Sequence, residues 1–86
     1  MPRDSEPSSA TVRYWAGARA AAGVESDVVS GCRTVADAVA TVDGLHPGLA
    51  AVTAVSTLLL DGRATSRDQV LPDGSVLEVL PPFAGG

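Results

Sequence analysis

The sequence predicts an α+β fold in which a mixed sheet is covered on one face by one main helix. Three observations lead to this prediction. Segments typical of β-strands occur in two pairs, one pair towards each end of the chain. One clearly amphipathic helical segment lies between the two pairs. The chain has 86 residues, which suffices for one hydrophobic core but not for two.

The first pair of strands is expected to flank a short helix. In TVRYWA, residues 11–16, small or apolar residues alternate with Arg13 and Trp15, which predicts a strand with two distinct faces. The alanine-rich segment AGARAAAG follows, and Gly23 is suited to the C-cap of one or two helical turns. The more polar segment VESDVVSG, residues 24–31, predicts a second strand at the edge of the sheet.

The main helix is predicted from TVADAVATVDG, residues 34–44. Thr34 is a typical N-cap, and Asp37 three residues later forms a variant of the capping box. Gly44 is expected to end the helix. The spacing of the apolar residues indicates one stripe that faces the core. The stripe consists of Val35, Ala38, Val39 and Val42.

The next segment, LHPGLAAVTAV, residues 45–55, leaves two alternatives open. Pro47 could open a short helix, or the segment could be largely loop. In STLLLDGR an apolar strand is expected to end at Asp61 and Gly62, a dipeptide that suits a tight turn. Residues 63–68 are expected to form a polar connection.

The last strand is predicted at residues 75–80, after a turn at Pro72, Asp73 and Gly74. This strand, SVLEVL, is apolar on both faces except for Glu78, a pattern typical of a strand near the sheet centre. If the first and last strands lie side by side there, they run parallel and are joined by a right-handed crossover. This arrangement is the β-grasp, or ubiquitin-like, architecture.

Three regions are expected along the chain. Residues 1–10 carry two prolines, three serines and mixed charge, which predicts a disordered leader. Residues 11–80 are expected to form the β-grasp domain. Residues 81–86 are expected to form an extended, flexible C-terminal Gly-Gly tail.

The charge composition argues against nucleic-acid and membrane partners. The net charge is −4, and the six basic residues are all arginines that are scattered among ten carboxylates. A protein partner with a basic docking surface fits this balance better. The polar start, MPRDSEPSSA, lacks the apolar region of a signal peptide, and we therefore expect a cytoplasmic protein.

Few side chains suggest chemistry of their own. Cys32 is the only cysteine, which excludes an internal disulfide and a cysteine metal cluster, and we interpret it as a small buried hydrophobe. His46, the only histidine, is interpreted as a surface residue. No general acid, general base or metal site is recognisable. We therefore expect no stand-alone enzymatic activity.

The chemically distinctive segment is the ending, PPFAGG. Pro81 and Pro82 stop the last strand, because proline cannot donate to the ladder, and they stiffen the base of an arm that can reach about 20 Å. Phe83 can anchor this arm apolarly. The two terminal glycines lack Cβ atoms, so they could enter a narrow channel and present the carboxylate of Gly86 for activation. The alternative is a flexible end that finishes in glycines by chance.

Residues 11–86 resemble the MoaD/ThiS family of sulfur carriers. The segment AVSTLLLDGRATSRDQVLPDGSVLEVLPPFAGG is similar to the family's closing pattern, and YWAGARAAAG is similar to its first strand and short helix. The resemblance implies that Gly86 is the catalytic residue, which an E1-like adenylyltransferase adenylates with ATP before its conversion to a thiocarboxylate. It implies no bound cofactor and no metal. The implied partner-binding residues are Pro81, Pro82, Phe83, Ala84 and Gly85.

Within the family, PPFAGG is more similar to the molybdopterin branch than to the thiamine branch. This implies the small subunit of a molybdopterin synthase, which donates sulfur for the molybdenum cofactor with a large, MoaE-like subunit as partner. Three alternatives stay open. The chain could be a sulfur carrier for thiamine, cysteine or a specialised metabolite, a ubiquitin-like protein modifier, or a non-catalytic interaction module.

Overall fold

A computed structural model describes residues 7–82, and residues 1–6 and 83–86 lie outside the described part of the chain. Among the described residues, no helix has the length and apolar character needed to cross a membrane. The elements follow one another as β1 (Ser8–Tyr14), α1 (Ala16–Ala22), β2 (Ser26–Cys32), α2 (Val35–Leu45), α3 (Ala50–Thr53), β3 (Thr57–Leu60), β4 (Arg63–Ala64) and β5 (Ser75–Leu80).

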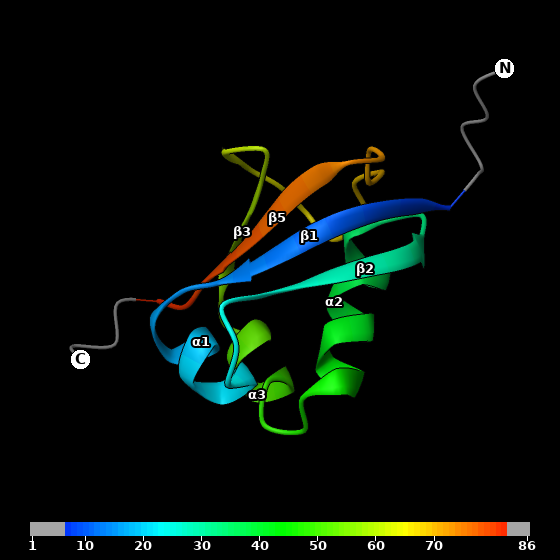
Figure 1. Ribbon diagram of the computed structural model, residues 1–86. Coiled ribbons are helices and arrows are strands. Elements are labelled where there is room, and N and C mark those ends of the chain that lie inside the picture. Colours follow the sequence, from blue (N-terminus) through cyan, green and yellow to red (C-terminus); the bar gives the residue numbers. More distant parts are fainter. Residues whose placement is uncertain (1–6, 83–86) are drawn as a thin grey trace, which may run out of the picture.

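The strands form one mixed sheet in the order β2-β1-β5-β3-β4. The central strands β1 and β5 run parallel, and the other neighbours are antiparallel. Figure 1 shows that α1, α2 and α3 all lie on the same side of this sheet. The fold is therefore the β-grasp, or ubiquitin-like, architecture predicted from the sequence, with β5 at the centre and β2 at an edge as expected.

β1 begins at Ser8, three residues earlier than the sequence pattern indicates. Backbone bonds hold this start: the N–H of Gly74 donates to the carbonyl of Ser9 at 2.7 Å, and Ala10 pairs with β2 and is buried. The last residues of the segment predicted as a leader thus belong to the sheet. At its other end the strand stops at Tyr14, so Trp15 and Ala16, which the strand pattern included, lie outside β1. Ala16 begins α1, as the segment AGARAAAG indicates.

α1 ends as predicted. Gly23 has the left-handed φ of 76° that a glycine C-cap adopts, and its N–H donates to the carbonyl of Arg19 at 2.9 Å. β2 follows over Ser26–Cys32, two residues later than the start indicated by the sequence.

α2 begins with the predicted capping box. The N–H of Asp37 donates to Thr34 Oγ1 at 3.2 Å, and Asp37 Oδ2 accepts the N–H of Thr34 at 3.1 Å. The predicted end at Gly44 is wrong, because the helix continues to Leu45 and His46 is its C-cap. Glycine inside a helix costs only about 1 kcal/mol, and beyond it the N–H of His46 still donates to the carbonyl of Val42 at 3.1 Å.

The ambiguous segment after α2 contains the short helix α3. Leu49 before it is fully buried, whereas Val55 after it is 63% exposed and does not join the core. The next turn contains Asp61 and Gly62 with φ of 49° and 85°, the positive values that a tight hairpin requires. It leads into β4, a two-residue strand inside the segment expected to be a polar connection.

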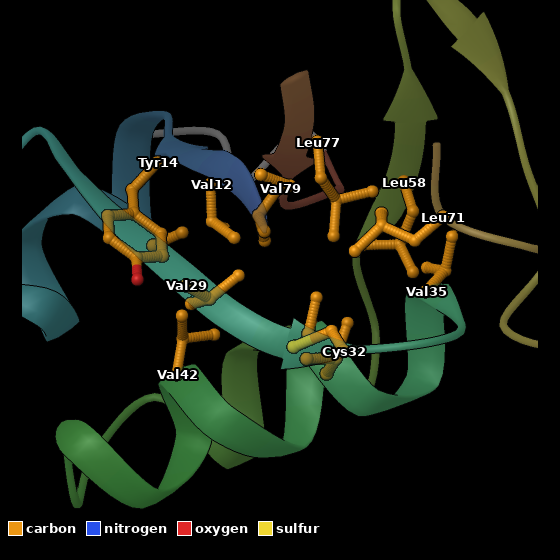
Figure 2. Packing of buried hydrophobic residues seen from close by; sticks show 14 of the residues in the cluster. Val12, Tyr14, Val29, Cys32, Val35, Val42, Leu58, Leu71, Leu77 and Val79 are labelled. Atoms are coloured by element: carbon orange, nitrogen blue, oxygen red, sulfur yellow. The ribbon is translucent and has the colours of Figure 1, made fainter. Parts of the chain in front are cut away.

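The core lies between the sheet and the helices. Figure 2 shows side chains from β1 and β5 facing side chains from α2, with Leu71 added by the connection that precedes β5. This connection is fastened to the start of α2, since the N–H of Val35 donates to the carbonyl of Gln69 at 2.9 Å. The buried side chains labelled in Figure 2 are Val12, Tyr14, Val29, Cys32, Val35, Val42, Leu58, Leu71, Leu77 and Val79.

Candidate functional site

The candidate site is the end of the central strand β5, where the chain leaves the sheet. We call residues 79–82 the neck. Leu80 is the last residue of β5 and pairs with Thr57 of β3. On the other side of β5, Tyr14 of β1 pairs with Val79, which is fully buried. The neck therefore starts from a central strand that is paired on both sides.

Of the predicted site residues, the structure places Pro81 and Pro82. Both follow β5 directly and lie outside any strand, with Pro81 half-buried and Pro82 exposed. Phe83, Ala84, Gly85 and Gly86 lie outside the described residues. Proline has no backbone N–H, so the ladder ends at Leu80 as the sequence indicates.

One residue that follows β1, Trp15, contacts β5 twice at the start of the neck, once through its backbone and once through its side chain. The N–H of Trp15 donates to the carbonyl of Val79 at 3.2 Å, and its indole Nε1–H donates to Glu78 Oε2 at 3.0 Å. The guanidinium carbon of Arg13 lies 5.0 Å from the centre of the indole ring, within the range of a cation–π interaction.

These contacts lie on the face of the sheet that the helices leave open. Along β1, Val12 and Tyr14 point into the core, so Arg13 between them points to the opposite face. Glu78 likewise lies between the buried Leu77 and Val79, and it is the register partner of Arg13. Ala16 then has a φ of 48°, and this rare conformation turns the chain from the open face into α1.

A second polar cluster joins β1, β2 and the end of α2. The hydroxyl of Tyr14 donates to Asp27 Oδ2 at 2.7 Å, and His46 Nε2 lies 2.6 Å from the same oxygen. The rings of Tyr14 and His46 meet edge to face with centroids 5.9 Å apart. The interpretation of His46 as a surface residue is therefore wrong, since its side chain is only 18% exposed and pairs with a carboxylate.

The cluster shifts the pKa of two of its members. Burial and the hydrogen bond to Asp27 raise the pKa of Tyr14 far above its usual value, so this phenol stays protonated. For Asp27, partial burial raises the pKa, but the hydrogen bonds from His46 and Tyr14 outweigh it, so the net pKa lies below the usual value. Asp27 is thus an ionised acceptor that holds both neighbours.

Cys32 is buried, as predicted for a small hydrophobe. Its thiol lies 3.6 Å from the carbonyl oxygen of Ser30 and 3.8 Å from the hydroxyl of Thr41. Within residues 7–82, no group of three or more His, Cys, Asp or Glu side chains is arranged to hold a metal ion.

Sequence reasoning missed the contacts of Trp15 and of Asp27. The alternation in TVRYWA places Trp15 on the face opposite Tyr14, and parallel pairing of the first and last strands brings that face next to Glu78. Combining these two predictions could have located the Trp15 contact. No comparable signal links Asp27 to His46, because they are 19 residues apart on different elements.

Comparisons with known proteins agree with this fold. The model of the ThiS family matches residues 12–86, which include the neck and the tail. A comparison with curated proteins finds no match.

Solved structures are similar over nearly the whole chain. Small archaeal modifier protein 1 of Haloferax volcanii is 27% identical, with a TM-score of 0.79 over 91% of this chain and 99% of that one. The same modifier of Methanosarcina acetivorans is 22% identical, with a TM-score of 0.83 over 93% and 98%. A Pyrococcus furiosus protein assigned as molybdopterin converting factor, subunit 1, is 28% identical, with a TM-score of 0.77 over 88% and 99%.

Proposed function

Because this chain belongs to the ThiS family of ubiquitin-like sulfur carriers and modifiers, we propose that it carries sulfur on the terminal carboxyl of Gly86. The observation that supports this role is the way in which the neck leaves the sheet. The central strand β5 is held on both sides, stops at Leu80, and continues directly into Pro81 and Pro82. Such a base presents the following four residues, FAGG, from a fixed point with little loss of conformational freedom.

Activation of the carboxyl needs ATP, because a free carboxylate is a poor electrophile. A carboxylate oxygen of Gly86 attacks the α-phosphorus of ATP, pyrophosphate leaves, and an acyl adenylate forms. Hydrosulfide then attacks the acyl carbon, the bond from this carbon to the phosphate oxygen breaks, AMP leaves, and loss of a proton gives the thiocarboxylate. The ATP site belongs to an E1-like adenylyltransferase, which we propose as the activating partner.

The remaining tail residues are assigned to partner binding. Pro81 and Pro82 keep the base of the arm stiff, and Phe83 supplies an apolar anchor in the partner. Ala84 and Gly85 narrow the arm, so that the carboxyl of Gly86 can enter a channel that a larger side chain would block. The net charge of −4 favours partners with a basic docking surface.

For the destination of the sulfur, we propose the small subunit of a molybdopterin synthase, with a large, MoaE-like subunit as acceptor. The support is the PPFAGG ending together with the 28% identity to the Pyrococcus furiosus protein assigned as molybdopterin converting factor, subunit 1. Carriers for thiamine, cysteine or a specialised metabolite share the same tail chemistry. The acceptor protein distinguishes these destinations.

A protein modifier is the second candidate, favoured by the 27% identity to small archaeal modifier protein 1 of Haloferax volcanii. In this role a lysine amine of another protein attacks the activated carboxyl of Gly86 and forms an isopeptide bond. This protein contains no lysine, so a second copy cannot be attached to one of its own side chains through such a bond. Conjugates that disappear when Gly86 is deleted would support this candidate.

Intact-mass measurement tests the carrier role. The chain is incubated with an E1-like adenylyltransferase, ATP and sodium sulfide, and a parallel sample lacks ATP. We expect a mass gain equal to the exchange of one oxygen for one sulfur, only when ATP is present. An unchanged mass in both samples, with an adenylyltransferase that is active on its own carrier, would contradict the proposal.

Affinity capture then tests the destination. The thiocarboxylated chain is presented separately to a molybdopterin synthase large subunit and to a thiazole synthase, each with the substrate that receives the sulfur, and loss of sulfur from the chain is followed by mass. We expect the large subunit to bind the chain and to transfer its sulfur to the substrate. Transfer to the thiazole synthase alone would overturn the molybdopterin assignment while leaving the carrier role intact.

A further inference from the structure

Trp15 is unusual among the apolar residues of the chain because it is large, partly exposed and yet held in place. It is 42% exposed and lies on the open face of the sheet, away from the core. Its indole nevertheless has a hydrogen-bond partner, Glu78, and a cation, Arg13, at its ring. A tryptophan that is 42% exposed, lies outside the core and is fixed by polar contacts serves a purpose other than core packing.

The location of these contacts indicates that purpose. The paired residues of β1 and β5 end at Tyr14 and Val79. Beyond this pair, the backbone bond from Trp15 to the carbonyl of Val79 is the last bond that the β1 side gives to β5 in the described chain. The indole bond to Glu78 reinforces the same stretch from the open face. Trp15 therefore fastens β5 at Glu78 and at Val79, the first residue of the neck.

The conformation of the chain around Trp15 is consistent with a fixed position. Ala16 has a positive φ of 48°, which a non-glycine residue adopts only when the surrounding structure holds it. The carbonyl of Trp15 accepts the N–H of Ala18 at 2.9 Å, which ties the residue to the first turn of α1. Trp15 thus connects α1, β1 and the end of β5.

We propose that Trp15 is a positioning residue that sets the direction in which the neck leaves the sheet, with Glu78 and Arg13 as its supports. This inference rests on the proposed carrier function. With the neck fixed, most docked carriers present the tail to the channel of the activating enzyme. Without the indole contact, the neck has more orientations, and a smaller fraction of docked carriers has the carboxyl in place.

The kinetic test uses Trp15→Phe, Glu78→Ala and the double variant in the thiocarboxylation assay. Phenylalanine keeps an apolar ring but cannot donate to Glu78. We expect each single variant to lower kcat by about three- to tenfold, the equivalent of one hydrogen bond. KM should stay near the wild-type value, because the body still docks. The double variant should be no slower than either single variant, because both remove one interaction.

Two variants serve as controls. Glu78→Gln keeps an oxygen acceptor for the indole and should restore kcat to within about twofold of wild type. Asp73→Ala removes a comparable exposed contact at the opposite end of the strand pair, where Asp73 Oδ1 accepts the N–H of Ser9 at 2.8 Å. It should leave kcat and KM unchanged, which separates an effect at the neck from a general loosening of the sheet.

A spectroscopic readout follows the contact without the enzyme. Trp15 is the only tryptophan, so its indole N–H gives one identifiable NMR resonance. We expect slower hydrogen exchange of this proton in wild type and Glu78→Gln than in Glu78→Ala. Equal exchange in all three proteins would overturn the contact on which the inference depends.

The outcomes separate the inference from the carrier function. If wild type gains sulfur and both single variants match its kcat, the positioning role is wrong and the carrier function stands. If the variants raise KM while kcat is unchanged, Trp15 contacts the partner directly, which also overturns positioning. If wild type gains no sulfur, the carrier function fails and the positioning role fails with it.

Discussion

Replacement of Asp27 by alanine is expected to lower the free energy of unfolding by about 2–3 kcal/mol at pH 7. Asp27 Oδ2 accepts the hydroxyl of Tyr14 at 2.7 Å and lies 2.6 Å from His46 Nε2. A hydrogen bond to a charged group contributes about 1.5–3 kcal/mol, so two give at least about 3 kcal/mol. Because the side chains of His46 and Asp27 remain 18% and 24% exposed, we expect a value at or just below this lower limit.

The same carboxylate predicts a pH dependence. The pKa of Asp27 is lower in the folded protein than its usual value, through its hydrogen bonds from His46 and Tyr14. The stabilisation is therefore present above the usual pKa of an aspartate and is lost as the pH falls through the folded pKa. The stability difference between wild type and Asp27→Asn should narrow as the medium is acidified below about pH 4.

Urea denaturation followed by Trp15 fluorescence measures both effects, since this residue is the only tryptophan. Glu25→Ala is the matched control, because the ion pair of Glu25 with Arg19 is exposed on both sides and should contribute less than about 1 kcal/mol. The reasoning is refuted if Asp27→Ala is within about 0.5 kcal/mol of wild type, the usual range for an uninvolved surface residue.

Three further substitutions test the fold. Thr34→Ala removes the hydroxyl that caps α2 and should lower the free energy of unfolding by about 1 kcal/mol, which corresponds to a fall in Tm of about 4–8 °C. An unchanged Tm would contradict the capping role of Thr34. Leu77→Ala leaves a cavity beside fully buried neighbours and should lower the free energy of unfolding, measured by urea denaturation, by about 2–5 kcal/mol. A loss below about 1 kcal/mol would place Leu77 outside the core. Gly62→Ala places a side chain at a turn position with a φ of 85° and should lower the free energy of unfolding by about 1 kcal/mol in the same assay. A variant more stable than wild type would show that residue 62 does not have a positive φ.

The parts of the fold that follow local rules could be predicted from the sequence. The capping box of Thr34 and Asp37 involves groups three residues apart, so the motif is visible in the sequence and present in the structure. The central position of β5 follows from its apolar residues on both faces, and the parallel pairing with β1 follows from the crossover between them.

The errors concern the ends of elements and the shortest strand. Gly44 resembles a helix end, but α2 continues one residue past it, and the N–H of His46 closes the last turn on the carbonyl of Val42. The start of β1 at Ser8 depends on bonds to the turn around Gly74, more than sixty residues later. β4 has only two residues, too few for any alternation to be recognised.

For the candidate site, the sequence located the stop of β5 but not what holds it. Pro81 and Pro82 end the strand because proline has no backbone N–H to donate, and in the structure they follow Leu80 directly. Predicting the contacts of Trp15 with β5 requires the register of β1 against β5, which is a feature of the tertiary structure. The roles of Phe83 to Gly86 stay predictions, since these residues lie outside the described part of the chain.

Peptide-level mass spectrometry after activation tests the central claim most directly. Wild type and a variant with one alanine added after Gly86 are incubated with the adenylyltransferase, ATP and sodium sulfide, then digested. We predict that wild type gains sulfur only on the peptide that ends in Gly86, and that the extended variant gains none. Sulfur bound at Cys32, or equal gain at the end of the extended variant, would contradict the account.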